Sequence, residues 1–226
     1  MSILFLSDID GTLVKGSSIA IETKEALKEF VKCGNRFSLA TGRHAFGIQW
    51  LLDQIPVNAP CIILTGAAVY DPLTKSLLHA KPLHDDTRML LSQLFDEYPE
   101  MGIQVFTESG LCNLRLNPFL QNHGIPEEIA CGTSGIEALE GKRILKVGLC
   151  CEDKGKIEPA INRFFPDRQK FNWHYSFVIA AEVFSPDASK GIAIQSIIES
   201  LPEKPDCIAV AGDSPNDLSF YIDGSA

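Results

Sequence analysis

Asp8 and Asp10 are the first residues in this sequence whose types and spacing suit catalysis or metal binding. They follow a short apolar run, Ile3–Leu6, that is typical of a buried strand, and they precede Gly11. Residues i and i+2 of an extended chain point to the same side, so both carboxylates can face one small volume beyond the strand. Two carboxylates at such a short distance repel each other, so the pair needs a hard cation or a shared proton. Asp and Gly are also common in solvated turns, so this stretch alone leaves both interpretations open.

Three further polar clusters lie at the end of a predicted strand or at the start of a predicted helix. They are Thr41 with Gly42, Lys190, and Asp213 with Asp217. The carboxyl ends of parallel strands share one edge of a sheet, so clusters far apart in sequence can converge there. Together they offer a nucleophile, an acid–base group, a hydroxyl donor, a fixed cation and metal-binding carboxylates. These parts suit phosphoryl transfer, in which positioning and charge neutralisation supply most of the catalysis.

Each of these clusters also has a structural explanation when it is taken alone. Thr41 and Gly42 suit an ordinary turn from a strand to a helix, and most lysines are solvated, as Lys190 could be. Asp213 and Asp217 could be acids that stabilise a helix N-terminus. Turn chemistry does not easily produce all four clusters in this order at strand ends, so the set favours the functional interpretation.

The elements that position these residues alternate between strand and helix. Predicted strands and helices before residue 81 are Ile3–Leu6, Thr23–Lys32, Arg36–Ala40, Ala45–Leu52 and Cys61–Leu64, and those near the C-terminus are Gly191–Ser200 and Cys207–Ala211. This order predicts an α/β fold with a doubly wound, mainly parallel, Rossmann-like core sheet. Asp187 or Ser189 can cap the helix that begins near Lys190.

Residues 81–185 have a different pattern, in which strands outnumber helices and look antiparallel. The helices are expected over Asp85–Tyr98 and Lys156–Phe165, the strands over Ile103–Phe106, Leu111–Leu116, Ile144–Cys151 and Phe171–Val183, and a region bearing proline and glycine spans Asn117–Gly141. We therefore expect a catalytic core formed by residues 1–80 and 186–226, with an α+β domain inserted over residues 81–185.

Composition limits the kinds of partner. The 226 residues carry a net charge of −9 with a pI of about 5.0, which argues against nucleic acid or an anionic membrane as the main partner. The seven cysteines form no C-x-x-C pair, and most lie in apolar runs, which is typical of reduced thiols in the cytoplasm. The first residues resemble no secretory signal, and no apolar run has the length of a membrane span.

The ordered motifs resemble those of haloacid-dehalogenase-superfamily (HAD) phosphatases. They are D-x-D-G-T at Asp8–Thr12, the strand-terminal Thr41, Lys190, and G-D-x-x-x-D at Gly212–Asp217. The insertion between Thr41 and Lys190 resembles the C2-type cap of the Cof-like and sucrose-phosphatase-like subgroup. The resemblance implies a Mg²⁺-dependent phosphatase that acts on a small phosphorylated metabolite, and a sugar phosphate is the expected substrate.

By this resemblance, Asp8 attacks phosphorus and forms an aspartyl-phosphate. Asp10 protonates the leaving alcohol and then activates the water that releases phosphate. Thr41 and the backbone N–H groups of Ile9 and Gly42 hold the phosphoryl oxygens, and Lys190 offsets charge on the nucleophile and the phosphate.

The resemblance also implies a metal site. Asp8, the backbone carbonyl of Asp10 and Asp213 would bind Mg²⁺ together with waters. Asp217 would support this shell from behind or orient Lys190, and Asn216 could donate a hydrogen bond to the phosphate.

Five further residues are weaker candidates. His44 is expected to be a first-turn helix residue, and Arg43 to be a brace or a substrate contact. In the insertion, Arg115, His174 and Glu182 are candidate specificity residues.

The chain departs from the subgroup's pattern in two places. The third predicted strand ends in Thr65-Gly66 where relatives usually have Asn-Gly, and a threonine has a different reach. The sequence stops at Ala226, soon after the last motif, whereas relatives continue through another strand and a helix. The expectation is therefore an apparently C-terminally incomplete core, or a sheet edge that a partner completes, as in a homodimer.

Other functions stay open beside the hydrolase. A phosphomutase of the same fold would transfer the phosphoryl group between sugar hydroxyls. A signalling receiver domain also uses strand-end acids, Thr and Lys, but it has no room for a domain between Thr41 and Lys190. A catalytically silent HAD-fold binding module is the remaining alternative.

Overall fold

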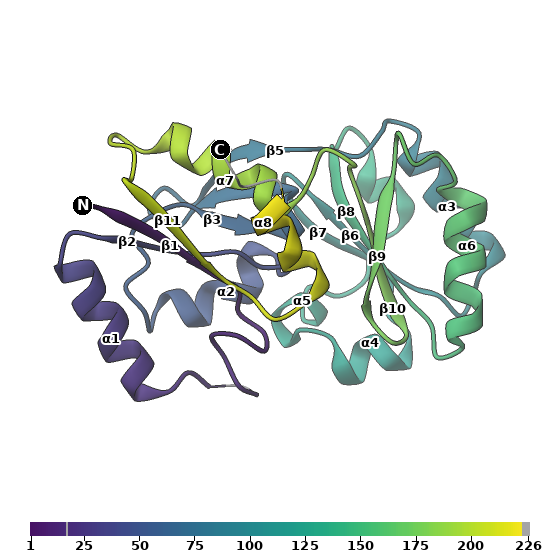
Figure 1. Ribbon diagram of the computed structural model, residues 1–226. Coiled ribbons are helices and arrows are strands. Elements are labelled where there is room, and N and C mark those ends of the chain that lie inside the picture. Colours follow the sequence, from purple (N-terminus) through teal and green to yellow (C-terminus); the bar gives the residue numbers. More distant parts are fainter. Residues whose placement is uncertain (17, 223–226) are drawn as a thin grey trace. The chain divides into compact units, whose positions relative to one another are not determined.

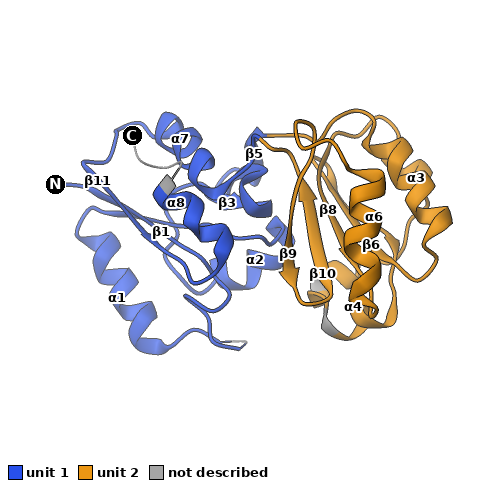
Figure 2. Ribbon diagram, turned by 45° about the vertical axis from the view of Figure 1, so that its right-hand side comes forward, with its two compact units in different colours: residues 1–80, 187–226 blue, residues 81–186 orange. Residues whose placement is uncertain are grey.

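The computed structural model describes residues 1–16 and 18–222. The chain divides into two compact units, Met1–Ala80 with Asp187–Ala226, and Lys81–Pro186 (Figure 2). We call them the core unit and the inserted unit. Residues 17 and 223–226, which the predicted catalytic core includes, lie outside the described residues.

The core unit is built on a parallel sheet with the strand order β11-β1-β2. Its strands are β1 (Ile3–Ser7), β2 (Arg36–Leu39) and β11 (Cys207–Ala211). Leu4 of the central strand pairs with Ile208 on one side and with Arg36 on the other. Leu4 and Leu6 are fully buried, as expected for a strand that is covered on both faces. This sheet therefore brings residues from both ends of the sequence to one edge.

Helices lie on both sides of this sheet, as the doubly wound prediction requires. Figure 1 shows α7 on one side of β11, β1 and β2, and α1 on the other. The helices of the core unit are α1 (Ile21–Lys32), α2 (Ala45–Leu52), α7 (Lys190–Ser200) and α8 (Ser219–Ile222), with short 3₁₀ turns η1 (Leu64–Gly66) and η4 (Pro215–Leu218). The predicted α/β fold class is confirmed. Within the described residues, no helix combines the length and apolarity that crossing a bilayer requires.

Two short strands of the core unit were not predicted. β4 (Ala68–Asp71) and β5 (Ser76–Ala80) continue antiparallel from β3 (Cys61–Ile63). A parallel bridge between Ala40 and Ile62 connects β3 to the end of β2. Hydrogen bonds between neighbouring residues stabilise the hairpin turn: the carboxylate of Asp71 accepts from the Leu73 N–H at 2.9 Å and from the Thr74 hydroxyl at 2.8 Å.

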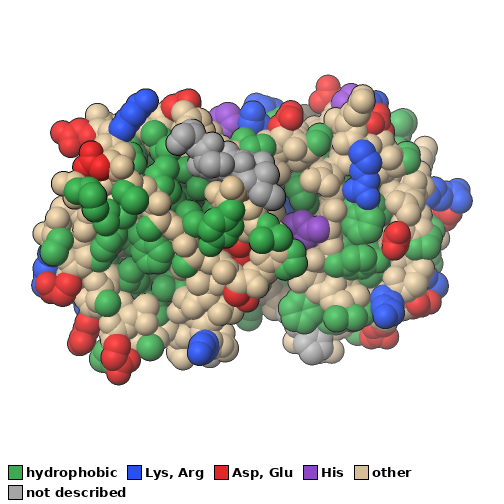
Figure 3. Space-filling model, viewed as in Figure 1, with side chains coloured by type: hydrophobic (Ala, Val, Ile, Leu, Met, Phe, Trp, Pro, Cys, Tyr) green, Lys and Arg blue, Asp and Glu red, His purple; other side chains and the backbone are tan. Residues whose placement is uncertain are grey.

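β11 is the outer strand of the parallel sheet within the described part of the chain. Cys207 of this strand is exposed and its other residues are partly buried, whereas three of the five residues of β1 are buried. Ile208 and Val210 pack against the core from this strand, while Leu218 and Tyr221, which follow it in η4 and α8, are exposed. Figure 3 shows hydrophobic side chains on this face, where Figure 1 places β11 and α8.

The inserted unit is α+β, with an antiparallel sheet in the order β7-β6-β8-β10-β9. Its strands are β6 (Gly102–Thr107), β7 (Gly110–Arg115), β8 (Ile144–Cys150), β9 (Asn172–Phe177) and β10 (Ala180–Phe184), and its longer helices are α3 (Thr87–Glu97) and α6 (Ile157–Phe164). Val105, Val147 and Val183 share one buried cluster with Leu91 and Ile161, so α3 and α6 cover that face. The region Asn117–Gly141 folds into short helices: α4 (Pro118–His123), α5 (Pro126–Ile129) and η2 (Ile136–Leu139).

The other face of this sheet carries polar side chains from adjacent strands. Lys146 of β8 donates to Glu182 of β10 at 2.8 Å, and His174 of β9 lies 3.6 Å from the second oxygen of Glu182. Arg115 has a structural environment, because its guanidinium donates to the backbone carbonyls of Tyr98 at 2.7 Å and Phe95 at 2.8 Å. Among the three candidate specificity residues, Arg115 therefore braces the fold of its own unit.

Candidate active site

Asp8 follows the last residue of β1, at the carboxyl edge of the parallel sheet. Its backbone N–H donates to the carbonyl of Ala211 at 2.8 Å, which continues the pairing with β11 by one residue. The residue is only 6% exposed, and its Oδ1 accepts a hydrogen bond from Lys190 Nζ at 2.6 Å. The sheet therefore fixes the backbone of Asp8, and a buried lysine fixes its side chain.

Lys190 is the first residue of α7 and is completely buried. Ser189 caps the helix, because its hydroxyl accepts from the Ile192 N–H at 3.0 Å. Gly66 packs directly against this cap: a Cβ there would lie 2.1 Å from the Ser189 carbonyl oxygen, so only glycine fits. Lys190 Nζ lies between two carboxylates, with Asp8 Oδ1 and Asp217 Oδ1 each at 2.6 Å.

Asp217 connects Lys190 to the loop that follows β11. Its Oδ2 accepts from the backbone N–H of Asp213 at 3.1 Å and of Ser214 at 3.0 Å, and from the Ser214 hydroxyl at 2.9 Å. Pro215 lies in the first turn of η4, where its missing N–H is not needed. One carboxylate thus holds both the lysine and the backbone that carries Asp213.

Asp213 approaches the N-terminal loop very closely. Thr12 donates from its hydroxyl to Asp213 Oδ1 at 2.7 Å. Gly11 has a φ of +88°, which favours glycine, and a Cβ there would lie 2.2 Å from Asp213 Oδ2. Both the backbone conformation and the available space therefore require glycine at this position. The Gly-Thr pair after Asp10 therefore admits and orients an acid from the far end of the sequence. The sequence suggested no separate role for Thr12.

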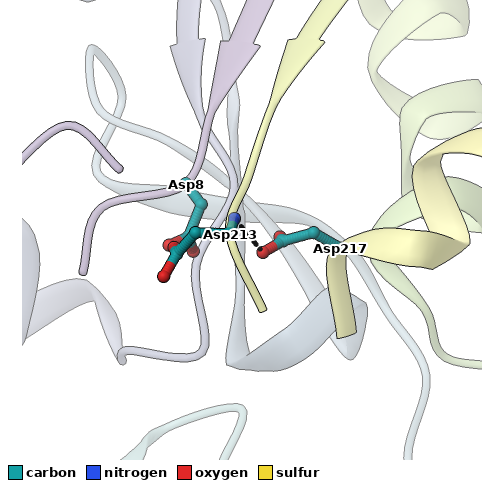
Figure 4. Close-up of side chains that lie close together, drawn as sticks. All are labelled: Asp8, Asp213 and Asp217. Carbon is teal, nitrogen blue, oxygen red and sulfur yellow. Dashed lines mark hydrogen bonds between the residues drawn. The ribbon is translucent and has the colours of Figure 1, made fainter. Parts of the chain in front are cut away.

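Asp8, Asp213 and Asp217 each offer a carboxylate oxygen, and these oxygens lie within 4.8 Å of one another (Figure 4). In Figure 4 the carboxylates of Asp8 and Asp213 lie side by side, one from the end of β1 and the other from the end of β11. Asp8 and Asp217 are buried and Asp213 is exposed, and the formal charges of the three carboxylates and Lys190 sum to −3 + 1 = −2. A hard divalent cation with oxygen ligands fits this donor set and its charge.

Burial raises the pKa of the Asp8 carboxyl above its ordinary value, and the charge and hydrogen bond of Lys190 oppose this rise. The nucleophile candidate thus depends on nearby positive charge to remain ionised.

Asp10 is separate from this carboxylate cluster. Its side chain is 54% exposed and pairs with Arg43, whose guanidinium donates to both carboxylate oxygens. The sequence offered Arg43 only as a brace or a substrate contact.

Thr41 lies beside Arg43 and is 1% exposed. Its backbone N–H donates to Ile62 at 2.9 Å, and its hydroxyl oxygen accepts from the Arg43 N–H at 3.1 Å. A hydroxyl that accepts in this way keeps its own proton for another acceptor.

The turn after β3 braces this loop at a conformational cost. Leu64 and Thr65 have φ values of 51° and 60°, in the left-handed region that bulky and β-branched residues avoid. Their backbone N–H groups donate to the carbonyls of Arg43 and Thr41, each at 3.0 Å. Strain of this kind is typical of functional sites. Thr65 thus contributes its backbone to the Thr41 loop.

The remaining candidates have local partners. Asn216 accepts a hydrogen bond from the Ser214 hydroxyl at 2.6 Å, and Gly42 is half-buried between Thr41 and Arg43. His44 is the N-cap of α2, where its Nδ1 accepts from the Phe46 N–H at 3.3 Å.

The sequence matches the model of the haloacid dehalogenase-like hydrolase family over residues 5–220, so the chain belongs to this family. It is 24% identical to the Bacillus subtilis protein named 5-amino-6-(5-phospho-D-ribitylamino)uracil phosphatase YwtE, over 95% of this chain and 82% of that protein.

Solved structures share the fold. A haloacid dehalogenase-like hydrolase from Bacteroides thetaiotaomicron matches with a TM-score of 0.82 and 20% identity, over 97% of this chain and 85% of that one. The HAD subclass IIB sugar phosphatase BT4131 matches with a TM-score of 0.78 and 19% identity, over 97% and 84%. The predictions of a HAD-superfamily phosphatase and of a phosphomonoester hydrolase are confirmed at the level of the family.

Proposed function

We propose that the core unit is the Mg²⁺-dependent active site of a phosphatase that hydrolyses a small phosphomonoester through a phosphorylated Asp8. The observation that carries this proposal is the environment of Asp8 at the end of β1. Lys190 binds its Oδ1 at 2.6 Å, which leaves Oδ2 for attack, and two more carboxylates lie beside it. A cluster with a formal charge of −2, in which Asp8 and Asp217 are buried and Asp213 is exposed, suits a divalent cation better than a purely structural role.

In the first half-reaction, Asp8 Oδ2 forms a bond to phosphorus and the bond from phosphorus to the alcohol oxygen breaks. Asp10 gives its proton to that oxygen. In the second half-reaction, Asp10 takes a proton from a water molecule, whose oxygen bonds to phosphorus as the bond to Asp8 breaks. The products are the alcohol and inorganic phosphate, and both aspartates return to their starting states.

The other residues hold the phosphoryl group and the cation. Thr41 can donate its hydroxyl proton, Gly42 its N–H and Asn216 its amide to the phosphoryl oxygens, while Lys190 contributes charge. Asp8, Asp213 and the carbonyl of Asp10 would hold Mg²⁺, and Asp217 would support them; when bound, the ion offsets the repulsion between carboxylate and phosphate.

For the substrate, we propose a small phosphorylated metabolite, and specifically a sugar phosphate. Support comes from the name of the Bacillus subtilis relative, which contains a phosphorylated ribityl group, and from a structural neighbour described as a sugar phosphatase. We also propose a cytoplasmic location, where thiols such as those of Cys61 and Cys150, buried in this fold, stay reduced.

The test is hydrolysis of p-nitrophenyl phosphate by the wild-type protein with Mg²⁺, with EDTA, and by Asp8→Asn. We expect activity that requires Mg²⁺ and that falls by about 10⁴-fold or more in Asp8→Asn. A folded, Mg²⁺-loaded protein that releases no phosphate from this ester or from a panel of phosphorylated sugars would contradict the proposal. Release without an acceptor sugar separates a hydrolase from a phosphomutase.

A further inference from the structure

Arg43 holds the Asp10 carboxylate by both of its oxygens. Nε of Arg43 donates to Asp10 Oδ2 at 2.8 Å, and Nη2 donates to Asp10 Oδ1 at 2.6 Å. Two parallel hydrogen bonds from a planar guanidinium fix the orientation of a carboxylate as well as its position.

The arginine is the better anchored of the two partners. Its side chain is 20% exposed, against 54% for Asp10. Nη1 of Arg43 donates to the carbonyl of Gly47 in α2 at 3.2 Å, and its backbone carbonyl accepts from the Leu64 N–H at 3.0 Å. The arginine is therefore built into the loop after β2, and the half-exposed aspartate is the group that is held.

The neighbourhood of Asp10 makes this restraint important. Asp8 lies two residues away and pairs with Lys190. The carboxylate cluster consists of Asp8, Asp213 and Asp217, and the side chain of Asp10 is not part of it. Without Arg43, a half-exposed carboxylate two residues from Asp8 could turn toward a cation bound by that cluster. Proton transfer requires the acid–base group to lie within hydrogen-bond reach of the reacting oxygen.

We propose that Arg43 is a positioning residue, which holds the Asp10 carboxyl group out of the carboxylate cluster and aligned with the leaving oxygen. In the protonated acid, one carboxyl oxygen keeps its hydrogen bond from Arg43, and the other carries the proton that passes to the leaving alcohol. This inference rests on the proposed phosphatase function. Arg43 needs no contact with substrate for this role. Lysine could not fully replace it, because an ammonium group does not have the planar fork that binds both carboxylate oxygens.

The experiment compares two esters that differ in their need for a proton donor. p-Nitrophenolate leaves without protonation, whereas an alkoxide does not, and kcat/KM reports the steps up to phosphoryl transfer. In Arg43→Met we expect kcat/KM for an alkyl phosphate such as glycerol phosphate to fall by about 10- to 100-fold. The value for p-nitrophenyl phosphate should stay close to that of the wild type.

Two comparisons make the result specific. Arg36→Met is the matched control, because Arg36 begins β2, the strand that precedes the Arg43 loop, and its guanidinium donates to the backbone carbonyl of Glu203 at 2.7 Å, outside the proposed site; it should change neither value. The double variant Arg43→Met/Asp10→Asn should be no worse on the alkyl ester than Asp10→Asn, because both changes remove the same aligned group.

An equal fall with both esters, or independent effects in the double variant, would overturn the inference and indicate that Arg43 acts on the phosphate itself. Circular dichroism checks that each variant is folded. If Arg43→Met does not fold, Arg43→Lys gives the same test, with a partial loss confined to the alkyl ester. A wild-type protein that hydrolyses neither ester would instead refute the proposed function.

Discussion

Each unit buries one lysine within the described residues, and the surroundings of the two lysines differ in charge balance. Lys146 in the inserted unit lies against the Phe106 ring and donates to one carboxylate, Glu182, at 2.8 Å. Lys190 in the core unit lies between two carboxylates, with Asp213 as a third beside them. The first pair is neutral, 1 − 1 = 0, whereas the second cluster carries a net −2.

The two sites show that a buried lysine can serve either a structural pair or a cluster suited to binding a cation. A pair of one lysine and one carboxylate is balanced in formal charge. A cluster with excess negative charge is costly alone and becomes favourable when it binds a cation. Negative charge that a cluster of acids leaves uncompensated is thus a better guide to function than burial of a lysine as such. The predictions below test this contrast, in order of decreasing effect.

Lys190→Met should have the largest effect, because it leaves Asp8 and Asp217 buried together without their shared cation. We expect the free energy of unfolding to fall by about 3–5 kcal/mol without Mg²⁺, and kcat/KM for p-nitrophenyl phosphate to fall by about 10²–10³-fold. Urea unfolding and steady-state kinetics measure the two changes. A variant as stable and as active as the wild type would show that Lys190 neither stabilises the two buried carboxylates nor contributes to catalysis.

Mg²⁺ should stabilise the wild-type protein by about 2.7 kcal/mol when its concentration is a hundred times its Kd. Asp213→Asn should lose most of this gain, because it removes one carboxylate from the cluster. Lys146→Met is the matched control, since its neutral pair lies in the other unit and should keep the response to Mg²⁺. Thermal unfolding at several Mg²⁺ concentrations is the measurement, and an equal response in Asp213→Asn would be evidence against this cation site.

Lys146→Met should destabilise the protein by about 1–3 kcal/mol, less than Lys190→Met does. Methionine keeps much of the contact with Phe106, and Glu182 is 16% exposed, so water can reach the carboxylate that loses its partner. Adding Glu182→Gln should recover part of the loss, because the double variant removes the unpaired charge. If Lys146→Met costs more than Lys190→Met in urea unfolding, charge balance is the wrong distinction between the two sites.

The smallest expected effect is the pH dependence of stability that comes from one buried thiol in each unit. Burial raises the pKa of Cys61 in the core unit to about 11 and that of Cys150 in the inserted unit to about 12, from an ordinary 9.0. Above pH 9 the unfolded chain releases thiol protons that the folded chain keeps, so stability that is present below pH 9 is lost as pH rises toward these values. For Cys61 the slope is about 1.4 kcal/mol per pH unit.

Urea unfolding of the wild type and of Cys61→Ala between pH 8 and 10.5 measures this slope, which the variant should lose in part. In thiol labelling of the folded protein, Mg²⁺ should slow the reaction of Cys61 more than that of Cys150, because the cation binds the core unit. Equal slowing of both thiols would mean that the two units open together.

The sequence was sufficient to predict the parallel sheet and the edge at which Asp8, Lys190 and Asp213 meet. Apolar runs that end in polar residues are local signals, and the position of strand ends in a parallel sheet is a general property of the fold. The Ser189 cap of α7 was also predictable, as one of two alternatives, from the residue types before Lys190.

Other features depend on partners that only the folded chain reveals. Arg43 has no sequence relation to Asp10, and Thr12 none to Asp213, because each pair joins side chains from separate elements. Lys146 lies in an apolar strand whose alternation indicates a face but not the neighbour on β10. The hairpin of β4 and β5 was missed because its strands are short and carry little periodicity.

The central claim is that Asp8 attacks phosphorus and that water then releases the phosphate. The stereochemical course of hydrolysis of a phosphorothioate monoester, whose phosphorus is made chiral by sulfur and oxygen isotopes and which is cleaved in isotopically labelled water, tests this most directly, because each in-line displacement inverts the configuration. The account predicts net retention, from two successive displacements at the same phosphorus. Net inversion would mean that water attacks the ester in one step, and Asp8 would then not be the nucleophile.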